Sequence, residues 1–164
     1  MKTEAAILVE TGKPLEIGHI EIPILKDGQI LVEIAYSGAC HTQLLEARGR
    51  RGKDPWLPHC LGHEASGVVL EVAGDVTRAV PGNRVALSWI KASGIEAGGT
   101  IYSWDGRSVN AGAVTTFQRH AVVSENRVTV LPDALEMQEA TLLGCALPTG
   151  LGAVVNVGKP NAGD

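Results

Sequence analysis

Two cysteines and one histidine are the residues of this chain best suited to bind a transition metal together. Cys40 begins the segment Cys40-His41-Thr42, His63 lies in Leu61-Gly62-His63-Glu64, and Cys145 follows Gly144 much further along the chain. Thiolate and imidazole are ligands that tetrahedral zinc prefers, and a catalytic zinc keeps three protein ligands and an open fourth position. Because the three residues are far apart in the sequence, they form such a site only if the fold brings them together.

The candidate ligands lie beside predicted strands and helices. Apolar alternation and turn residues predict strands over residues 3–10, 15–22, 29–37, 66–73, 84–89, 113–123 and 127–131. Residues 40–47 are predicted as a short helix, and helical spacing of apolar residues predicts helices over 135–147 and 151–157. Residues 91–112 contain many glycines without apolar periodicity, so we expect a long loop there. The predicted order is many strands first and helices last.

Composition places the chain among ordinary globular domains. It has 164 residues, 45% hydrophobic and 20% charged, which is enough for one domain with a core. The net charge of -4 argues against a nucleic-acid-binding surface. No apolar run approaches the roughly 18 residues of a membrane span, and residues 1–4 do not open a signal peptide. Three cysteines, an odd number, fit a reducing compartment, so we expect a cytoplasmic protein with no membrane or nucleic-acid partner.

Four motifs carry a family resemblance that covers nearly the whole chain. They are Gly38-Ala39-Cys40-His41-Thr42, Leu61-Gly62-His63-Glu64-Ala65-Ser66-Gly67-Val68-Val69, Pro81-Gly82-Asn83-Arg84-Val85 and Leu143-Gly144-Cys145-Ala146-Leu147-Pro148-Thr149-Gly150. In this order and spacing the chain resembles the catalytic domain of the zinc-dependent medium-chain alcohol dehydrogenases. The resemblance implies a mainly β fold: a GroES-like, partly open β-barrel with a few short helices. It also implies a GroES-like zinc-binding domain over residues 1–146, with residues 147–164 beginning a C-terminal helical connection towards a Rossmann domain that the chain does not contain.

The same resemblance implies roles for single residues. The family's catalytic zinc ligands correspond to Cys40, His63 and Cys145, and its catalytic hydroxyl and the acid beside the zinc correspond to Thr42 and Glu64. The positions that face the coenzyme correspond to His41 and Thr149. An aromatic wall of the substrate pocket corresponds to Trp89. Trp56 either lines the substrate pocket or covers the core, and the sequence favours neither. Cys60 is interpreted as a core residue. His59 is interpreted as non-functional, although it borders the site.

Three departures from the family pattern change what we expect of the metal. The family commonly has an aspartate after the threonine to orient the zinc histidine, and this chain has Gln43, which holds an imidazole less firmly. Some members relay the proton through a histidine where this chain has Leu45. Many members bind a structural zinc through four cysteines in the region that corresponds to residues 90–112, which contain no cysteine here. We therefore expect one catalytic zinc and no structural zinc.

The cofactor site is the largest departure. No G-x-G-x-x-G motif that opens a helix after a strand occurs in the chain, so the NAD(P)-binding domain is expected to lie outside it. We expect a piece of a zinc-dependent NAD(P) alcohol dehydrogenase that interconverts an alcohol and an aldehyde or ketone. The zinc would polarise the substrate oxygen. The chain alone is expected to be inactive, and the full-length protein to act on a small molecule as a homo-oligomer.

Two alternatives stay open at this point. A non-catalytic GroES-like module for assembly or binding would share the β-rich pattern, and a zinc-free reductase of the same superfamily would share most of the motifs. The three Cys and His residues and Glu64 count against both, and metal content separates them from the zinc enzyme. The substrate alcohol, and the choice between NAD and NADP, are not encoded in these residues.

Overall fold

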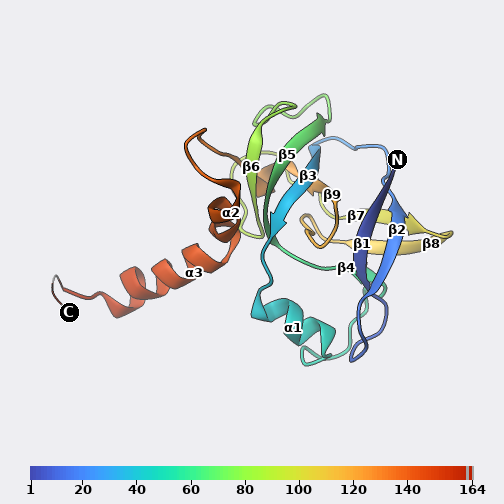
Figure 1. The fold of residues 1–164 in the computed structure, drawn as a ribbon, viewed down its shortest axis with the longest axis horizontal. Helices are drawn as coiled ribbons and strands as arrows, with labels where there is room; N and C mark the ends of the chain where they lie inside the picture. Colours follow the sequence, from blue (N-terminus) through green and yellow to red (C-terminus); the bar gives the residue numbers. More distant parts are fainter. Residues whose placement is uncertain (162, 164) are drawn as a thin grey trace.

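The computed structural model describes residues 1–161 and 163, and it places a small β-barrel beside a five-stranded sheet (Figure 1). The elements in chain order are β1 Lys2–Leu8, β2 Glu16–Glu21, β3 Gln29–Ser37, α1 His41–Ala47, β4 His59–Cys60, β5 Glu64–Val72, β6 Arg84–Ser88, β7 Thr100–Trp104, β8 Arg107–Ala111, β9 His120–Ser124, β10 Val128–Val130, α2 Met137–Ala140 and α3 Ala146–Gly152. Short 3-10 turns span Glu125–Arg127 and Thr141–Gly144, and a π-helical segment, Ala153–Gly158, follows α3. The mainly β architecture expected from the sequence is confirmed.

The barrel is formed by β1, β2, β7, β8 and β4 in that order. The short strand β4 closes it, because His59 pairs with Leu8 of β1 on one side and with Asn110 of β8 on the other. The sequence predicted a partly open barrel, and that detail is wrong, since two residues of β4 are enough to join both neighbouring edges. Buried side chains fill the barrel; they are Ala5, Ile7, Ile20, Leu31, Cys60, Tyr102, Val109 and Val122. Cys60 is therefore a core residue, as predicted.

The five-stranded sheet has the order β10-β6-β5-β3-β9 and is antiparallel throughout. Its core uses small and β-branched side chains, namely Ile30, Val32, Ala65, Val69, Ala79, Val85, Leu87, Val114, Ala121, Val123 and Val128. Tyr102 of the barrel joins the two parts, because its hydroxyl accepts hydrogen bonds from the Val122 backbone N–H at 2.8 Å and from Gln118 Nε2 at 3.0 Å. These bonds tie β7 of the barrel to β9 of the sheet.

The region predicted as a long loop contains a hairpin. Strands β7 and β8 pair from Thr100↔Ala111 to Trp104↔Arg107, so the loop prediction is wrong for residues 100–111. The turn is Asp105-Gly106, with φ of 48° and 79°, which are the positive values that a two-residue hairpin turn needs. The predicted strand over residues 113–123 is shorter than expected, since only His120–Ser124 forms β9.

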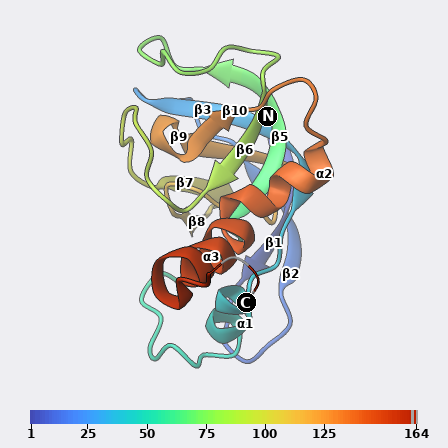
Figure 2. The same ribbon diagram turned by 90° about the vertical axis from the view of Figure 1, so that its left-hand side faces the viewer.

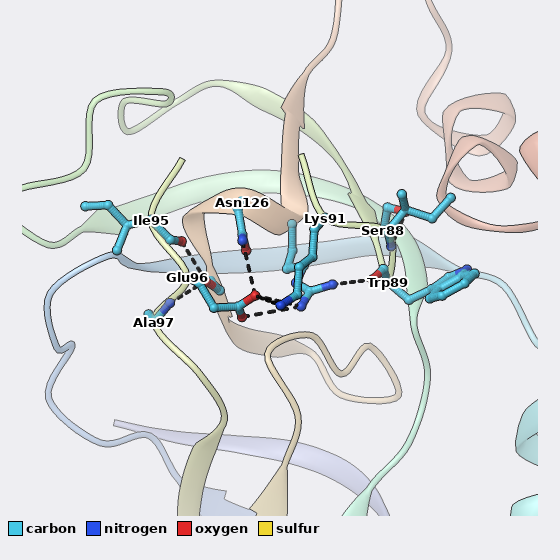
Figure 3. A network of polar contacts seen from close by, with 10 residues as sticks. Ser88, Trp89, Lys91, Ile95, Glu96, Ala97 and Asn126 are labelled. Carbon is cyan, nitrogen blue, oxygen red and sulfur yellow. Dashed lines mark hydrogen bonds and ion pairs between the residues drawn. The ribbon is translucent and has the colours of Figure 1, made fainter. Parts of the chain in front are cut away.

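The remaining loop, residues 91–97, is held by polar contacts without a metal ligand among them (Figure 3). The Glu96 carboxylate pairs with Lys91 at 2.8 Å and with Arg127 at 3.1 Å. Ion pairing with Lys91 lowers the pKa of Glu96 to about 2. The Ala97 N–H donates to Ser124 Oγ at 2.8 Å, and Arg127 also donates to the backbone oxygen of Trp89. We call these contacts the loop network.

Helix α2 packs against the five-stranded sheet, where Ser66 Oγ donates to the Met137 backbone oxygen, whereas α3 and the segment after it project away (Figures 1 and 2). Leu147 and Leu151 of α3 are 44% and 54% exposed, so this helix shows apolar side chains to solvent. Over the described residues no single helix has the length and apolar character to cross a membrane. Only the bent pair Met137–Gly144 and Ala146–Gly158, with a 57° bend, meets those criteria together.

Candidate metal centre

The backbone brings the three candidate ligands to one edge of the five-stranded sheet. Strand β3 ends beside the start of β5, where Ser37 pairs with Ala65, and Cys40 and His63 lie just beyond these ends. The Gly38 N–H donates to the Glu64 backbone oxygen at 3.0 Å and fixes this approach. Strand β6 ends at the same edge, where Ser88 Oγ donates to the Gly144 backbone oxygen at 2.6 Å and holds the residue before Cys145. Three distant segments therefore meet through sheet pairing.

The ligand atoms are arranged as a metal would require. Cys40, His63 and Cys145 each offer one ligand atom, and these atoms all lie within 4.8 Å of one another. The two sulfur atoms are 3.9 Å apart, against the about 3.8 Å expected of two thiolates at about 2.3 Å from a tetrahedral zinc. His63 Nε2 is buried and has no hydrogen-bond partner. A buried polar atom without a partner is unfavourable unless something else binds it, so the residues present fit a zinc ion.

Local contacts tune the three ligands differently. The backbone N–H of Thr42 stabilises the Cys40 thiolate and lowers its pKa. Burial raises the pKa of Cys145, which is 7% exposed. Burial also lowers the pKa of His63 and so favours the neutral imidazole, the form that binds metals. Cys40 is thus the thiol that ionises more readily in this pair.

Glu64 is buried next to the first residue of α3. It is 3% exposed, and its Oε2 accepts a hydrogen bond from the Ala146 backbone N–H at 3.1 Å. A Cβ at Gly144 would lie 2.2 Å from the Leu87 backbone oxygen and 2.6 Å from Glu64 Cβ, so only glycine allows this close packing. The Glu64 carboxylate therefore holds the start of α3 and, through it, Cys145.

Two threonine hydroxyls flank the thiols. Thr42 Oγ1 is 3.8 Å from Cys40 Sγ, and Thr149 Oγ1 is 4.0 Å from Cys145 Sγ. Both predicted site residues are thus beside the candidate ligands. His41, the other position predicted to face a coenzyme, begins α1 and is exposed.

A cavity of about 550 Å³ opens beside His63 and Gln43. Trp56, which is 66% exposed, lies on its wall, so the structure places this residue at a cavity and not over the core. Trp89 is 51% exposed and is not among the residues that line this cavity. Trp89, which the resemblance implies as an aromatic wall of the substrate pocket, therefore does not line the cavity that Trp56 lines.

The cavity also contains a pair that the sequence did not indicate. His59 Nε2 lies 2.8 Å from Asp54 Oδ2, and His59 Nδ1 lies 2.9 Å from the Cys60 backbone oxygen. Both oxygens only accept hydrogen bonds, so each bond needs a proton on the ring nitrogen that makes it. Its position four residues before His63 was the one signal that could have brought His59 into the predicted site.

Comparisons with known proteins identify the family of this domain. The family model described as "Alcohol dehydrogenase GroES-like domain" matches residues 26–133. The putative alcohol dehydrogenase D of Mycobacterium tuberculosis is 34% identical over 188 residues, which cover 100% of this chain and 50% of that protein. The S-(hydroxymethyl)glutathione dehydrogenase of Escherichia coli O1:K1 is 32% identical over 191 residues, 100% of this chain and 51% of that protein.

Solved structures give the same picture. An alcohol dehydrogenase zinc-binding domain protein from Burkholderia ambifaria has a TM-score of 0.82 and 25% identity, covering 95% of this chain and 49% of its own. A putative alcohol dehydrogenase from Sinorhizobium meliloti 1021 has a TM-score of 0.76 and 26% identity, covering 99% of this chain and 48% of its own. The chain spans about half the length of the curated relatives it matches.

Proposed function

This chain belongs to the family of alcohol dehydrogenase GroES-like domains, and on that premise we propose that it is the catalytic domain of a zinc-dependent alcohol dehydrogenase. The observation that carries the proposal is the cluster of Cys40, His63 and Cys145, with a buried His63 Nε2 that has no partner. The reaction is the interconversion of an alcohol with an aldehyde or ketone, with NAD or NADP as hydride carrier. A single zinc, held by these three residues, would polarise the substrate oxygen.

The chain's own residues supply the other functions. Thr42 Oγ1, beside Cys40, is the hydroxyl we assign to receive the proton of the substrate alcohol. Glu64 keeps Cys145 in place through the Ala146 N–H. His41 and Thr149 are assigned to the coenzyme, and Trp56 and Trp89 to the substrate. This division of roles follows the family resemblance, and the contacts around the thiols support it.

The charges around the cavity favour an uncharged substrate. Its wall carries Glu46, which pairs with Arg51 at 3.5 Å, and Asp54, which pairs with His59 at 2.8 Å. Neither pair leaves a cation available to hold a carboxylate or phosphate. The broad face of Trp56 suits an apolar or aromatic group.

The nicotinamide must be held largely by residues outside this chain, because its sequence lacks the glycine-rich dinucleotide fingerprint. We propose that residues 1–146 form the zinc-binding domain and that residues 147–164 begin the connection to a cofactor domain. On this proposal the isolated chain binds zinc but does not turn over alcohol, and the longer protein acts as a homo-oligomer. Its three cysteines are free, which supports a reducing compartment such as the cytoplasm. Sustained NAD(P)-dependent activity of the isolated chain would contradict this division.

Zinc content is the test of the proposed function. Elemental analysis of protein purified without added metal should give about one zinc per chain. Cys145→Ser should lose the zinc, whereas Cys60→Ala, a control that removes a cysteine outside the cluster, should keep it. No zinc in the wild type after zinc is supplied would overturn the proposal and favour a non-catalytic GroES-like module or a zinc-free reductase. About two zinc ions per chain would contradict the single site.

A further inference from the structure

Gln43 lies between two of the proposed zinc ligands. It is the third residue of α1 and is 6% exposed. Its Oε1 accepts a hydrogen bond from the Cys40 backbone N–H at 3.0 Å, and its Nε2 lies 2.6 Å from His63 Nδ1. The two ends of one amide therefore contact two different ligands.

The Cys40 N–H fixes which way this amide points. A backbone N–H can only donate, so the amide oxygen faces Cys40, and turning the amide over would set two donors against each other. The amide nitrogen then faces His63 Nδ1 and donates to it. Nδ1 must accept, so the neutral imidazole carries its proton on Nε2. That atom is the buried one without a partner.

This arrangement conflicts with zinc binding. A histidine nitrogen binds a metal through its lone pair, and the other ring N–H then donates to an acceptor. Coordination through Nε2 therefore needs the proton on Nδ1, and the acceptor within reach is Gln43 Oε1. The amide can present Oε1 to His63 only by giving up its bond to the Cys40 N–H.

We propose that Gln43 is a positioning residue that sets the tautomer of His63 and couples zinc binding to the turning of its own amide. This inference rests on the proposed zinc site. A carboxylate of the same length would remove the conflict, since one oxygen accepts from the Cys40 N–H and the other from His63 Nδ1–H. Gln43 thus makes this zinc site weaker and adds a rearrangement to metal loading.

Zinc affinity in Gln43→Glu tests the coupling. We expect it to rise about 10- to 100-fold, the range typical for partners of metal-bound histidines, measured by competition with a chromogenic chelator at neutral pH. Gln138→Glu is the matched control, because it makes the same change at an exposed position on α2, and its affinity should stay at the wild-type value. Unchanged affinity in Gln43→Glu would overturn the inference.

The added negative charge could tighten zinc by itself, so the tautomer needs its own measurement. Imidazole ¹⁵N shifts of the metal-free protein, with His63 assigned by its absence in His63→Gln, report which ring nitrogen is protonated. We expect Nε2–H in the wild type, and Nδ1–H in Gln43→Glu and in the zinc-loaded wild type. Tighter zinc without this change of tautomer would overturn the inference.

The outcomes separate this inference from the proposed function. If no variant binds zinc, the proposed function fails, and the metal-free tautomer of the wild type still decides the role of Gln43. If the wild type and Gln43→Glu bind one zinc equally, the zinc site stands and the coupling fails.

Discussion

The metal centre and the loop network both gather polar side chains from distant segments, yet they differ in which groups find partners within the protein. In the loop network and beside it, carboxylates receive donors at each oxygen. Glu96 pairs with Lys91 and Arg127 (Figure 3), and Glu125 accepts from backbone N–H groups. In the metal centre, His63 Nε2 has no partner, and the two thiols contact each other at 3.9 Å. Protein donors thus satisfy the carboxylates of the first region, although Asn126 Oδ1 and Arg127 Nε stay buried without partners, whereas in the second region the atom without a partner is a candidate metal ligand.

The difference explains how the loop of residues 91–97 is held without cysteines. Glu125, which is 1% exposed, accepts from the N–H groups of Ile95, Thr77 and Arg78 at 2.7–2.9 Å. Ser124 Oγ accepts from the Ala97 N–H and donates to the Ile95 backbone oxygen. Hydrogen bonds to Glu125 and Ser124 thus hold residues 91–97, in the region where many family members are expected to bind a structural zinc. The absence of a structural zinc stays a prediction that the zinc count will test.

Removing the Glu125 carboxylate should have the largest effect on stability. Glu125→Ala leaves the N–H groups of Ile95, Thr77 and Arg78 buried without acceptors, so the free energy of unfolding should fall by about 3 kcal/mol or more. Urea denaturation measures this change. Glu71→Ala, which removes an exposed carboxylate from β5, is the control and should stay within about 0.5 kcal/mol. A loss of zinc from folded Glu125→Ala would show that the two regions are coupled, against the comparison drawn above.

Zinc binding should raise the free energy of unfolding by slightly less than Glu125→Ala lowers it. At a free zinc concentration 100 times the dissociation constant, the free energy of unfolding should rise by about 2.7 kcal/mol. Cys40→Ser should abolish this rise, and Cys60→Ala should preserve it. Hydrogen exchange of the Ile95 and Ala97 amides should stay unchanged in the folded protein, since their partners lie in the other region. Thermal or urea denaturation with and without zinc measures the first effect.

Low pH should weaken the contacts of Glu96 and Glu125, because both carboxyl groups have lowered pKa values in the folded protein. Burial alone would raise the pKa of Glu125, but the N–H groups of Ile95, Thr77 and Arg78 outweigh it and the pKa is lowered. The pKa of Glu96 falls to about 2. A carboxyl group whose folded pKa is below its unfolded value stabilises the fold above the unfolded pKa of about 4.3 and loses that contribution as pH falls towards the folded pKa.

The contribution of these carboxylates to the free energy of unfolding should therefore be level above about pH 5 and decline between about pH 4.3 and 2. The lowered pKa of His63 adds a separate decline that begins below about pH 6.5 in every variant that keeps His63. Glu125→Gln should show a shallower decline, because it removes one carboxyl group with a lowered pKa. Asp54, whose pKa is also lowered, remains in both proteins and accounts for part of the slope that is left. Equal slopes in the two proteins would show that Glu125 does not titrate as its contacts indicate.

Much of the fold could be predicted because alternation and turn residues agree along the chain. Strand β3 has the predicted bounds, Gln29–Ser37, since its apolar run is long and a turn precedes it. The β7–β8 hairpin was missed because just Tyr102 and Val109 on its strands are buried apolar residues, so no alternation stands out. The Asp105-Gly106 pair was the available signal, because this dipeptide favours a two-residue hairpin turn.

The metal centre was predictable through ligand types and family motifs, whereas its partners were not. Sequence indicated that Gln43 replaces a carboxylate, but only the structure shows its amide divided between Cys40 and His63. The pairing of Asp54 with His59, and of Glu96 with Arg127, depends on strand register and loop shape. No local pattern specifies such contacts, because the partners are brought together by elements elsewhere in the chain.

The smallest expected effect concerns the exposed side of the loop network. Lys91 and Glu96 side chains are 65% and 36% exposed, so their ion pair should contribute less than about 1 kcal/mol despite the low pKa of Glu96. Arg127 is 10% exposed and also donates to the Trp89 backbone oxygen, so its coupling to Glu96 should be the larger of the two. Double-mutant cycles with Lys91→Met, Arg127→Met and Glu96→Gln measure both couplings by urea denaturation.

Salt separates the two pairs further. Raising ionic strength to about 1 M shortens the screening length to about 3 Å, so the exposed Lys91 pair should lose most of its coupling. The Arg127 pair, with its cation covered, should keep most of its own. A coupling for Arg127 that is no larger than that for Lys91, or equally sensitive to salt, would mean that the loop network is a solvated surface cluster. The contrast with the metal centre would then rest on Glu125 alone.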